Sequence, residues 1–195
     1  MGVLERKKEE KRQALLDAAY ALFLEHGAAK TSVSDITDRA RVAKGTFYLY
    51  FQDKDAVMQA LLGRISFRVL DEACRSVEAQ DLTRLMDKTV ALVDFIIEYF
   101  RREKLVLRLL EHNFTWPSLA EFQTAAETSP VLAHIRGIIR TSPELEGLDE
   151  ADVYRRMSAL IGMCISMCYS CLINNKPDTI DAMKPVLYEI IRKAL

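Results

Sequence analysis

The segment 31–51, TSVSDITDRARVAKGTFYLYF, constrains the fold of this chain more than any other. Ser32 followed by Asp35 resembles a capping box, in which a hydroxyl and a carboxylate satisfy free amides at the start of a helix. The apolar residues of this helix recur at helical spacing: Val33, Ile36 and Ala40. The segment therefore predicts a short helix, a tight turn and a second short helix.

The second of these helices has two different faces. At about 100° per residue, Phe47 and Phe51 point together toward a core. The opposite side carries small, hydroxyl and aromatic residues: Gly45, Thr46, Leu49 and Tyr50. Because Lys44 and Lys54 flank it, this face suits the major groove of DNA, where its hydroxyls and amines would meet phosphates first. The alternative is an ordinary packing helix with solvated tyrosines.

The same residues carry a family resemblance. The motif is Thr31-Ser32-Val33, Asp35-Ile36, Ala40, the run Val42-Ala43-Lys44-Gly45-Thr46-Phe47-Tyr48-Leu49-Tyr50-Phe51, and Lys54. It resembles the N-terminal domain of the TetR family of bacterial transcriptional regulators, and the similarity extends back through 13–27 and forward into 55–62. One departure is Arg41, which stands where the family usually has glycine in the turn.

The resemblance implies an all-α fold with two domains. Residues 1–53 would form the three-helix, helix-turn-helix DNA-binding domain, and residues 54–195 a larger helical ligand-binding and dimerisation domain. The implied function is a homodimeric repressor that releases a palindromic double-stranded DNA operator when a small-molecule effector binds. The expected DNA-binding residues are Thr31, Ser32, Lys44, Gly45, Thr46, Tyr48, Leu49, Tyr50 and Lys54.

Charge is distributed unevenly along the chain. Residues 1–54 hold 10 Lys and Arg against 8 Asp and Glu, a net charge of +2, while residues 55–195 hold 17 against 20, a net charge of −3. The basic start, residues 6–12, is interleaved with glutamates. It predicts either ion pairs along a solvated helix or an arm that binds a DNA groove.

The chain shows neither a signal peptide nor a membrane span, which predicts a cytoplasmic protein. The longest apolar run, 159–173, is 15 residues long and shorter than the roughly 20 needed to cross a bilayer. Three cysteines (Cys164, Cys168 and Cys171) fall on one face of a helix. They are either buried packing residues or a metal or oxidant sensor, and buried packing is favoured in a reducing cytosol. Neither a metal nor a cofactor is expected.

Helical patterning continues nearly throughout the chain. Helices are expected near 7–26, 54–76, 82–102 and 105–113, with Gly27 as a C-cap. Breaks are expected at 115–118, 128–130 and 141–149, where proline and small polar residues gather.

The last two helices predict a dimer. Apolar residues step by three and four in two seams: Val153, Met157, Leu160, Cys164 and Met167 in the first, and Ile180, Met183, Leu187 and Ile190 in the second. Pro185 should bend the final helix. The alternative is a monomer whose last hairpin packs only on its own core. The resemblance favours a four-helix bundle between two copies.

Aromatic and aliphatic residues of the middle helices exceed the need of a thin shell. The candidate lining of an effector pocket is Phe67, Phe95, Tyr99, Leu110, Phe114, Trp116, Phe122 and Cys168. The alternative for each is plain core. Two other functions compete: an enzyme, for which the sequence offers neither metal-ligand spacing nor a nucleophile motif, and a DNA-binding scaffold without a small effector.

Overall fold

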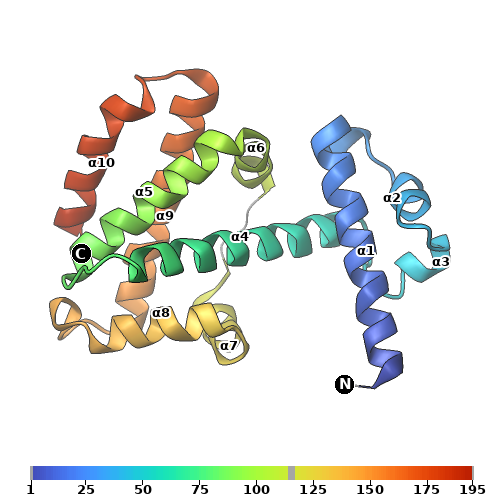
Figure 1. Cartoon of the computed structure of the whole chain (residues 1–195), viewed down its shortest axis with the longest axis horizontal. Helices are drawn as coiled ribbons and strands as arrows, with labels where there is room; N and C mark the ends of the chain where they lie inside the picture. Colours follow the sequence, from blue (N-terminus) through green and yellow to red (C-terminus); the bar gives the residue numbers. More distant parts are fainter. Residues whose placement is uncertain (1, 114–116, 195) are drawn as a thin grey trace. The chain divides into compact units, whose positions relative to one another are not determined.

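The computed structural model describes residues 2–113 and 117–194, and every regular element in that part of the chain is a helix (Figure 1). This confirms the all-α fold. The chain divides into two compact units between Ile65 and Ser66. Helix α4 (Lys54–Glu78) runs through this boundary, so the first unit includes the first turns of α4. The functional boundary expected after residue 53 stays a prediction.

The first unit contains α1 (Val3–His26), a 3-10 turn η1 (Ala28–Lys30), α2 (Val33–Ala40), α3 (Lys44–Phe47) and the start of α4. Helix α1 packs against α2, and α2 against α3. The core is drawn from all four helices and consists of Leu15, Leu16, Ala19, Phe23, Ile36, Phe47, Val57, Leu61 and Leu62.

Local chemistry fixes both ends of α1. The helix begins at Val3, earlier than the predicted 7, because the Gly2 amide donates to Glu5 Oε2 at 3.1 Å and caps the first turn. Gly27 ends it with a φ of 82° and donates its amide to the Phe23 carbonyl at 3.0 Å. The predicted C-cap is confirmed.

Capping and an unusual backbone conformation bound α2. Ser32 Oγ accepts the Asp35 amide at 3.1 Å, and Asp35 Oδ2 accepts the Ser32 amide at 2.7 Å, so the predicted capping box is confirmed. The hydroxyl and amide of Ser32 together lower the pKa of Asp35. Arg41 ends the helix in the left-handed region, with a φ of 56°. This conformation is ordinary for glycine and costs about 1–2 kcal/mol for most other residues.

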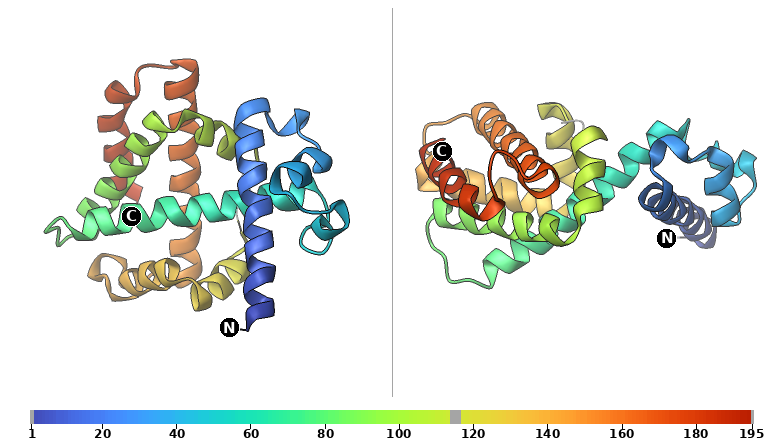
Figure 2. Two further views of the ribbon diagram at one scale, coloured as in Figure 1. Left: turned by 45° about the vertical axis from the view of Figure 1, so that its right-hand side comes forward. Right: turned by 90° about the horizontal axis from the view of Figure 1, so that it is seen from above.

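The second unit contains α5 (Leu85–Arg102), α6 (Lys104–Asn113), α7 (Leu119–Thr128), α8 (Pro130–Thr141), a 3-10 turn η2 (Pro143–Leu145), α9 (Glu150–Asn174) and α10 (Ile180–Ala194). Helices α5, α9 and α10 each contact the other two, while α6 packs on α9 and α7 pairs with α8 (Figure 2). A small cluster of Cys74, Ala126, Val131 and Leu132 is buried where α4, α7 and α8 meet.

The expected helix ends in this unit are close to those observed. Helix α5 begins at Leu85 rather than 82, since Glu144 Oε1 accepts the Leu85 amide at 3.0 Å and caps the helix from a distant segment. The break expected at 128–130 is confirmed, with Ser129 between α7 and α8. The break expected at 115–118 lies partly outside the described residues.

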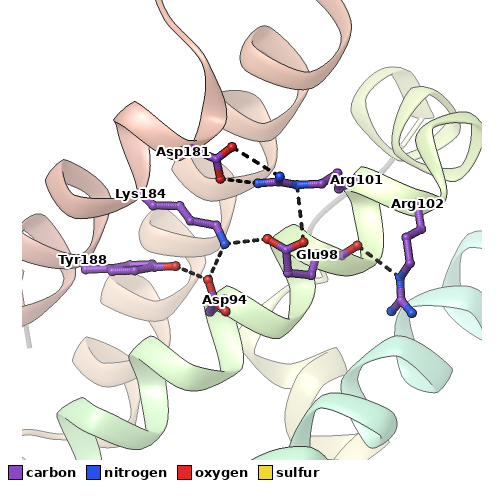
Figure 3. Close-up of polar contacts among 7 residues, drawn as sticks. All are labelled: Asp94, Glu98, Arg101, Arg102, Asp181, Lys184 and Tyr188. Carbon is purple, nitrogen blue, oxygen red and sulfur yellow. Dashed lines mark hydrogen bonds and ion pairs between the residues drawn. The ribbon is translucent and has the colours of Figure 1, made fainter.

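A charged network fastens α10 to α5 (Figure 3). Lys184 Nζ lies 2.7 Å from Asp94 Oδ1 and 2.5 Å from Glu98 Oε1. The Tyr188 hydroxyl donates to Asp94 as well. Burial alone would raise the pKa of Asp94, but donation by Lys184 and Tyr188 outweighs burial, and the pKa is lowered. At the other end of the network, Arg101 reaches Asp181 of α10 and Glu98 of its own helix.

Candidate nucleic-acid interface

Helix α3 is held by the ring of Phe47. The side chain is fully buried, with an exposed fraction of 0%, and its ring centroid lies 5.8 Å from that of Phe51. The chain continues beyond α3 in tight turns, in which Tyr50 and Phe51 both donate amides to the Phe47 carbonyl, at 2.9 and 3.0 Å. The helix begins after its N-cap, Ala43, and these turns continue it as a hydrogen-bonded segment as far as Phe51.

Burial of Phe47 leaves the opposite side of α3 open. Tyr48 is 54% exposed and Leu49 77% exposed, whereas Thr46 and Tyr50 are half-buried at the edge. Lys44 and Gly45 are exposed, and a Cβ added to Gly45 would meet nothing within 4 Å. The glycine therefore relieves no crowding inside the unit. The side expected to face outward does so, although its contact with DNA stays a prediction.

Thr31 does not belong to this outward face. Its exposed fraction is 3%, and its hydroxyl donates to the Gly27 carbonyl at 3.0 Å. The hydroxyl is thus committed to the end of α1. The prediction that this side chain contacts DNA is wrong for its hydroxyl, while Ser32 next to it is exposed.

Lys54 is committed to the protein in the same way. Its Nζ donates to the Ala28 carbonyl at 2.6 Å and to the Thr31 carbonyl at 2.9 Å. The ammonium therefore neutralises the carbonyl end of η1 and anchors the start of α4 beside it. The structure thus gives Lys54 an internal anchoring role, while its predicted contact with a DNA phosphate stays a prediction.

The remaining cations of the first unit separate into two groups. Four make intramolecular ion pairs or ring contacts: Arg6 with Glu10, Arg12 with Glu9 and over the Phe51 ring, Arg39 with Glu25, and Arg64 with Asp17. Among the described residues no such partner is seen for Lys7, Lys8, Lys11, Lys30, Arg41 and Lys44. The first group supports the fold, and the second is free to meet an external anion. Ion pairs are therefore confirmed for Arg6 and Arg12 within residues 6–12, while the alternative of an arm that binds a DNA groove stays a prediction.

The predicted dimer seam is largely internal to the protomer. Val153, Cys164, Ile180 and Leu187 are between 2% and 7% exposed, and Met157, Leu160, Met167 and Met183 are half-buried. Ile190, at 41%, is the member that lies outside. The prediction is wrong for the four buried residues, because they are covered within the protomer, where α9 packs on α5, α6 and α10, and α10 packs on α5.

The outer side of α10 carries a different apolar stripe. Val186 is 49% exposed, and it lies one turn from Ile190 and one turn from exposed Ala182. Helix α9 also leaves apolar residues uncovered, since 22% of its most apolar 18-residue stretch is buried. The sequence shows this stripe as Ala182, Val186 and Ile190, spaced by four. The seam on the other side of the helix has more apolar residues, and the dimer prediction is therefore based on that seam.

The candidate effector residues divide by burial. Tyr99, Leu110 and Cys168 are buried, Phe95 and Phe122 are half-buried, and Phe67 is 41% exposed, which places it at the surface of the unit rather than in its interior. Phe114 and Trp116 lie outside the described residues. Arg68 Nη2 donates to the Tyr99 hydroxyl at 3.3 Å, so one polar group accompanies this aromatic region.

The cysteines of α9 lie in a dry environment. Burial raises the pKa of Cys164 to about 11 and that of Cys168 to about 12. Thiols at these values stay protonated near neutral pH and react slowly. Among residues 2–113 and 117–194, no three His, Cys, Asp or Glu side chains gather in a way that could hold a metal ion. Packing is the role that burial supports.

Comparison with known proteins agrees with this geometry. Residues 15–61 match the family model described as bacterial regulatory proteins, tetR family. The probable acrEF/envCD operon repressor of Escherichia coli (strain K12) is 31% identical over 105 residues, covering 52% of this chain and 47% of that protein. The HTH-type transcriptional repressor BepR of Brucella suis biovar 1 (strain 1330) is 32% identical over 107 residues, covering 53% and 51%. The chain spans about half the length of these curated relatives.

Solved structures share the fold over nearly the whole chain. Thermus thermophilus FadR, a TetR-family transcriptional repressor in complex with lauroyl-CoA, has a TM-score of 0.65 at 20% identity and covers 94% of each chain. A TetR transcriptional regulator from Rhodococcus sp. RHA1 has a TM-score of 0.64 at 17% identity and covers 97% of each chain.

The anchoring role of Lys54 can be tested by stability. We expect Lys54→Met to lower the free energy of unfolding by about 1.5–3 kcal/mol, because hydrogen bonds from a charged donor are lost and two carbonyls are left unpaired. Urea unfolding followed by circular dichroism measures this. The control is Lys44→Met, which removes an unpaired, exposed ammonium and should change stability by no more than about 0.5 kcal/mol. Equal stability of Lys54→Met and wild type would contradict the anchoring role.

Proposed function

We propose that this chain, which carries the N-terminal domain of the TetR family of bacterial regulatory proteins, is a homodimeric, ligand-responsive DNA-binding transcriptional regulator that acts as a repressor. The observation that carries the proposal is the outward side of α3. Its exposed tyrosine, leucine and lysine are held rigidly by the buried Phe47, as direct recognition of a DNA groove requires. Both of the curated relatives described above are named as repressors.

The exposed residues divide by their chemistry into two kinds of contact. Ser32, Lys44 and Tyr48 carry hydroxyl or ammonium groups at the rim of the motif, which suit phosphate oxygens. Gly45, Thr46, Leu49 and Tyr50 lie on the outward side and at its edge, where base edges would be met. Thymine methyl groups suit Leu49, and the hydroxyls of Thr46 and Tyr50 can donate or accept.

A second copy of the chain is the proposed partner of α9 and α10. The exposed stripe of Val186 and Ile190 and the sparsely buried apolar surface of α9 leave a face that water would disfavour. By length and composition alone α9 could cross a membrane. Its Cys164, Cys168 and Cys171 are buried, however, and it packs on α5, α6 and α10, which is the setting of a core helix.

Dimerisation through this face gives the DNA-binding units a fixed relation to each other. Two-fold symmetry would present two α3 segments to successive major grooves of a palindromic operator, about 34–36 Å apart. A cytoplasmic location follows from this proposal, because the operator is there.

A small molecule is the proposed effector of the second unit. Two solved neighbours are FadR proteins in complex with an acyl-CoA: stearoyl-CoA for Bacillus subtilis and lauroyl-CoA for Thermus thermophilus. Tyr99, Leu110 and Phe122 are buried or half-buried apolar residues of this unit, and they are the proposed lining for a ligand of that general kind. A ligand that prefers the conformation with wrongly spaced DNA-binding units weakens operator affinity, with a coupling of about 1–3 kcal/mol. Binding and release, rather than catalysis, carry out this function.

The DNA-binding role of α3 predicts two losses. Tyr50→Ala should weaken binding to the operator by roughly 5- to 150-fold, as for one lost base contact of about 1–3 kcal/mol. Lys44→Ala should weaken binding and reduce the salt slope by about one for each half-site, or about two for the dimer. A gel shift measures both, with Lys104→Ala in the second unit as the control. If both α3 variants bind DNA like wild type, the docking of α3 is wrong.

The proposed dimer face predicts a change of mass. We expect the double variant Val186→Arg with Ile190→Arg to sediment as a monomer, because two charges would be buried unpaired in the interface. Sedimentation velocity gives the mass directly. Leu105→Arg is the matched control, since Leu105 is equally exposed, at 51%, but lies on α6. A double variant that keeps the mass of wild type contradicts this interface.

Effector binding predicts a rise in melting temperature. A ligand at about 100 times its dissociation constant stabilises its target by about 2.7 kcal/mol. Thermal shifts with lauroyl-CoA, stearoyl-CoA and a metabolite library, with free coenzyme A as the control, measure this. A compound that raises the melting temperature should also release DNA. Stabilisation without release would favour the alternative of a DNA-binding scaffold that no small molecule controls.

A further inference from the structure

An open groove lies between the start of α1 and the turn that precedes α3. Its volume is about 310 Å³, and seven residues line it: Lys7, Glu10, Lys11 and Ala14 from α1, and Ala40, Arg41 and Val42 from the turn. The four residues of α1 stand at i, i+3, i+4 and i+7, which is one face of a helix. Both walls belong to the first unit, so their relation to each other is set by its core.

The groove is electropositive. Lys7, Lys11 and Arg41 are exposed and have no ion pair or hydrogen bond within the part of the chain that the structure describes. The one acid of the lining, Glu10, lies 3.5 Å from Arg6 and is thereby balanced from outside the groove. Three cations therefore share a concave surface with a single acid, and none of the three is paired with it.

Arg41 joins the groove because it ends α2. It is the C-cap of that helix, in the left-handed conformation with a φ of 56°, and its amide donates to the Asp38 carbonyl at 3.2 Å. The backbone of Arg41 is thus fixed by the end of α2. Its guanidinium makes no ion pair or hydrogen bond within the described residues, so its charge is available to an outside anion.

The position of the groove relates it to α3. Only Val42 and Ala43 separate Arg41 from Lys44, the first residue of α3, so the two Cα atoms are at most about 11 Å apart. One DNA strand carries a charge about every 3.4 Å along the helix axis. A duplex that meets Lys44 therefore has further phosphates within the span of the groove.

We propose that Lys7, Lys11 and Arg41 form a second phosphate-binding surface, which holds the DNA backbone beside the segment that α3 reads. The inference rests on the proposed DNA-binding function and extends its footprint to the start of α1. The groove is open and lacks enclosing donors, which suits a polyanion that lies along it better than a free phosphate ion. Because the contacts are to phosphate, they add affinity and salt dependence without sequence preference.

The test measures the salt dependence of DNA binding. Wild-type protein first selects a duplex from a pool of random sequences, and this duplex is then labelled with a fluorophore. Anisotropy titrations of the labelled duplex at several salt concentrations give the slope of the logarithm of the binding constant against the logarithm of the salt concentration. Variants are Lys7→Gln, Lys11→Gln and Arg41→Gly. The matched control is Lys8→Gln, because Lys8 is an exposed lysine of the same helix that does not line the groove.

Each groove variant should reduce the magnitude of the slope by about 0.9 per half-site, or about 1.8 for the dimer, and the triple variant by about 5, while Lys8→Gln keeps the wild-type slope. Arg41→Gly should melt at or above the temperature of wild type, since glycine adopts this conformation freely. Misfolding is thereby excluded as the cause of weaker binding. Arg41→Lys, which keeps the charge, should keep the slope.

Failure of the inference and failure of the proposed function give different results. Groove variants that retain the wild-type slope, in a protein that binds the recovered duplex, overturn the phosphate-binding surface and leave the function standing. A control that lowers the slope as much as the groove variants overturns it too. If wild type recovers no duplex from the pool, and free phosphate displaces it from random-sequence DNA, both the inference and the proposed function are overturned.

Discussion

The burial of Phe47 is the interaction on which the first unit depends. Helix α3 has four residues and α2 has eight, and helices below about 12 residues have little stability of their own in water. Their shape therefore comes from tertiary anchors. Phe47 of α3 and Ile36 of α2 are fully buried in the core of this unit. Lys54 of α4 holds η1, the connection between α1 and α2, through the Ala28 and Thr31 carbonyls. Because Phe47 points into the core, the next two side chains along the turn, Tyr48 and Leu49, point outward.

The second unit depends on a different kind of anchor. Lys184 lies between Asp94 and Glu98, and Arg101 holds Asp181, so the orientation of α10 on α5 is set by charge as well as by apolar packing. This orientation turns Leu187 and Ile191 inward. It also turns Val186 outward, toward the proposed partner subunit. Polar pairs of this sort contribute modest stability but restrict how the helix can rotate.

Local signals in the sequence predicted much of the first unit. A capping box, a C-cap glycine and the spacing of two phenylalanines each depend on neighbours in the chain, and all three are seen in the structure. Lys54 and Thr31 were misjudged, because their partners lie 23 and more residues away in one case and at the end of the preceding helix in the other. Exposure of a polar side chain cannot be read from its type.

The dimer seam shows the limit of periodicity. Steps of three and four correctly identify an apolar face, as Val153, Cys164 and Leu187 demonstrate by their burial. They do not tell whether that face meets the same protomer or another one. For α10 the answer depended on Lys184 and Tyr188, whose pairing with α5 is a tertiary fact.

The central claim is that two copies of the chain present their α3 segments together to one DNA duplex. Hydroxyl-radical footprinting of the duplex recovered by wild type tests this claim most directly. The account predicts two protected tracts related by two-fold symmetry, with centres about 34–36 Å apart along the helix axis. A single protected tract, or two tracts without symmetry, would contradict it.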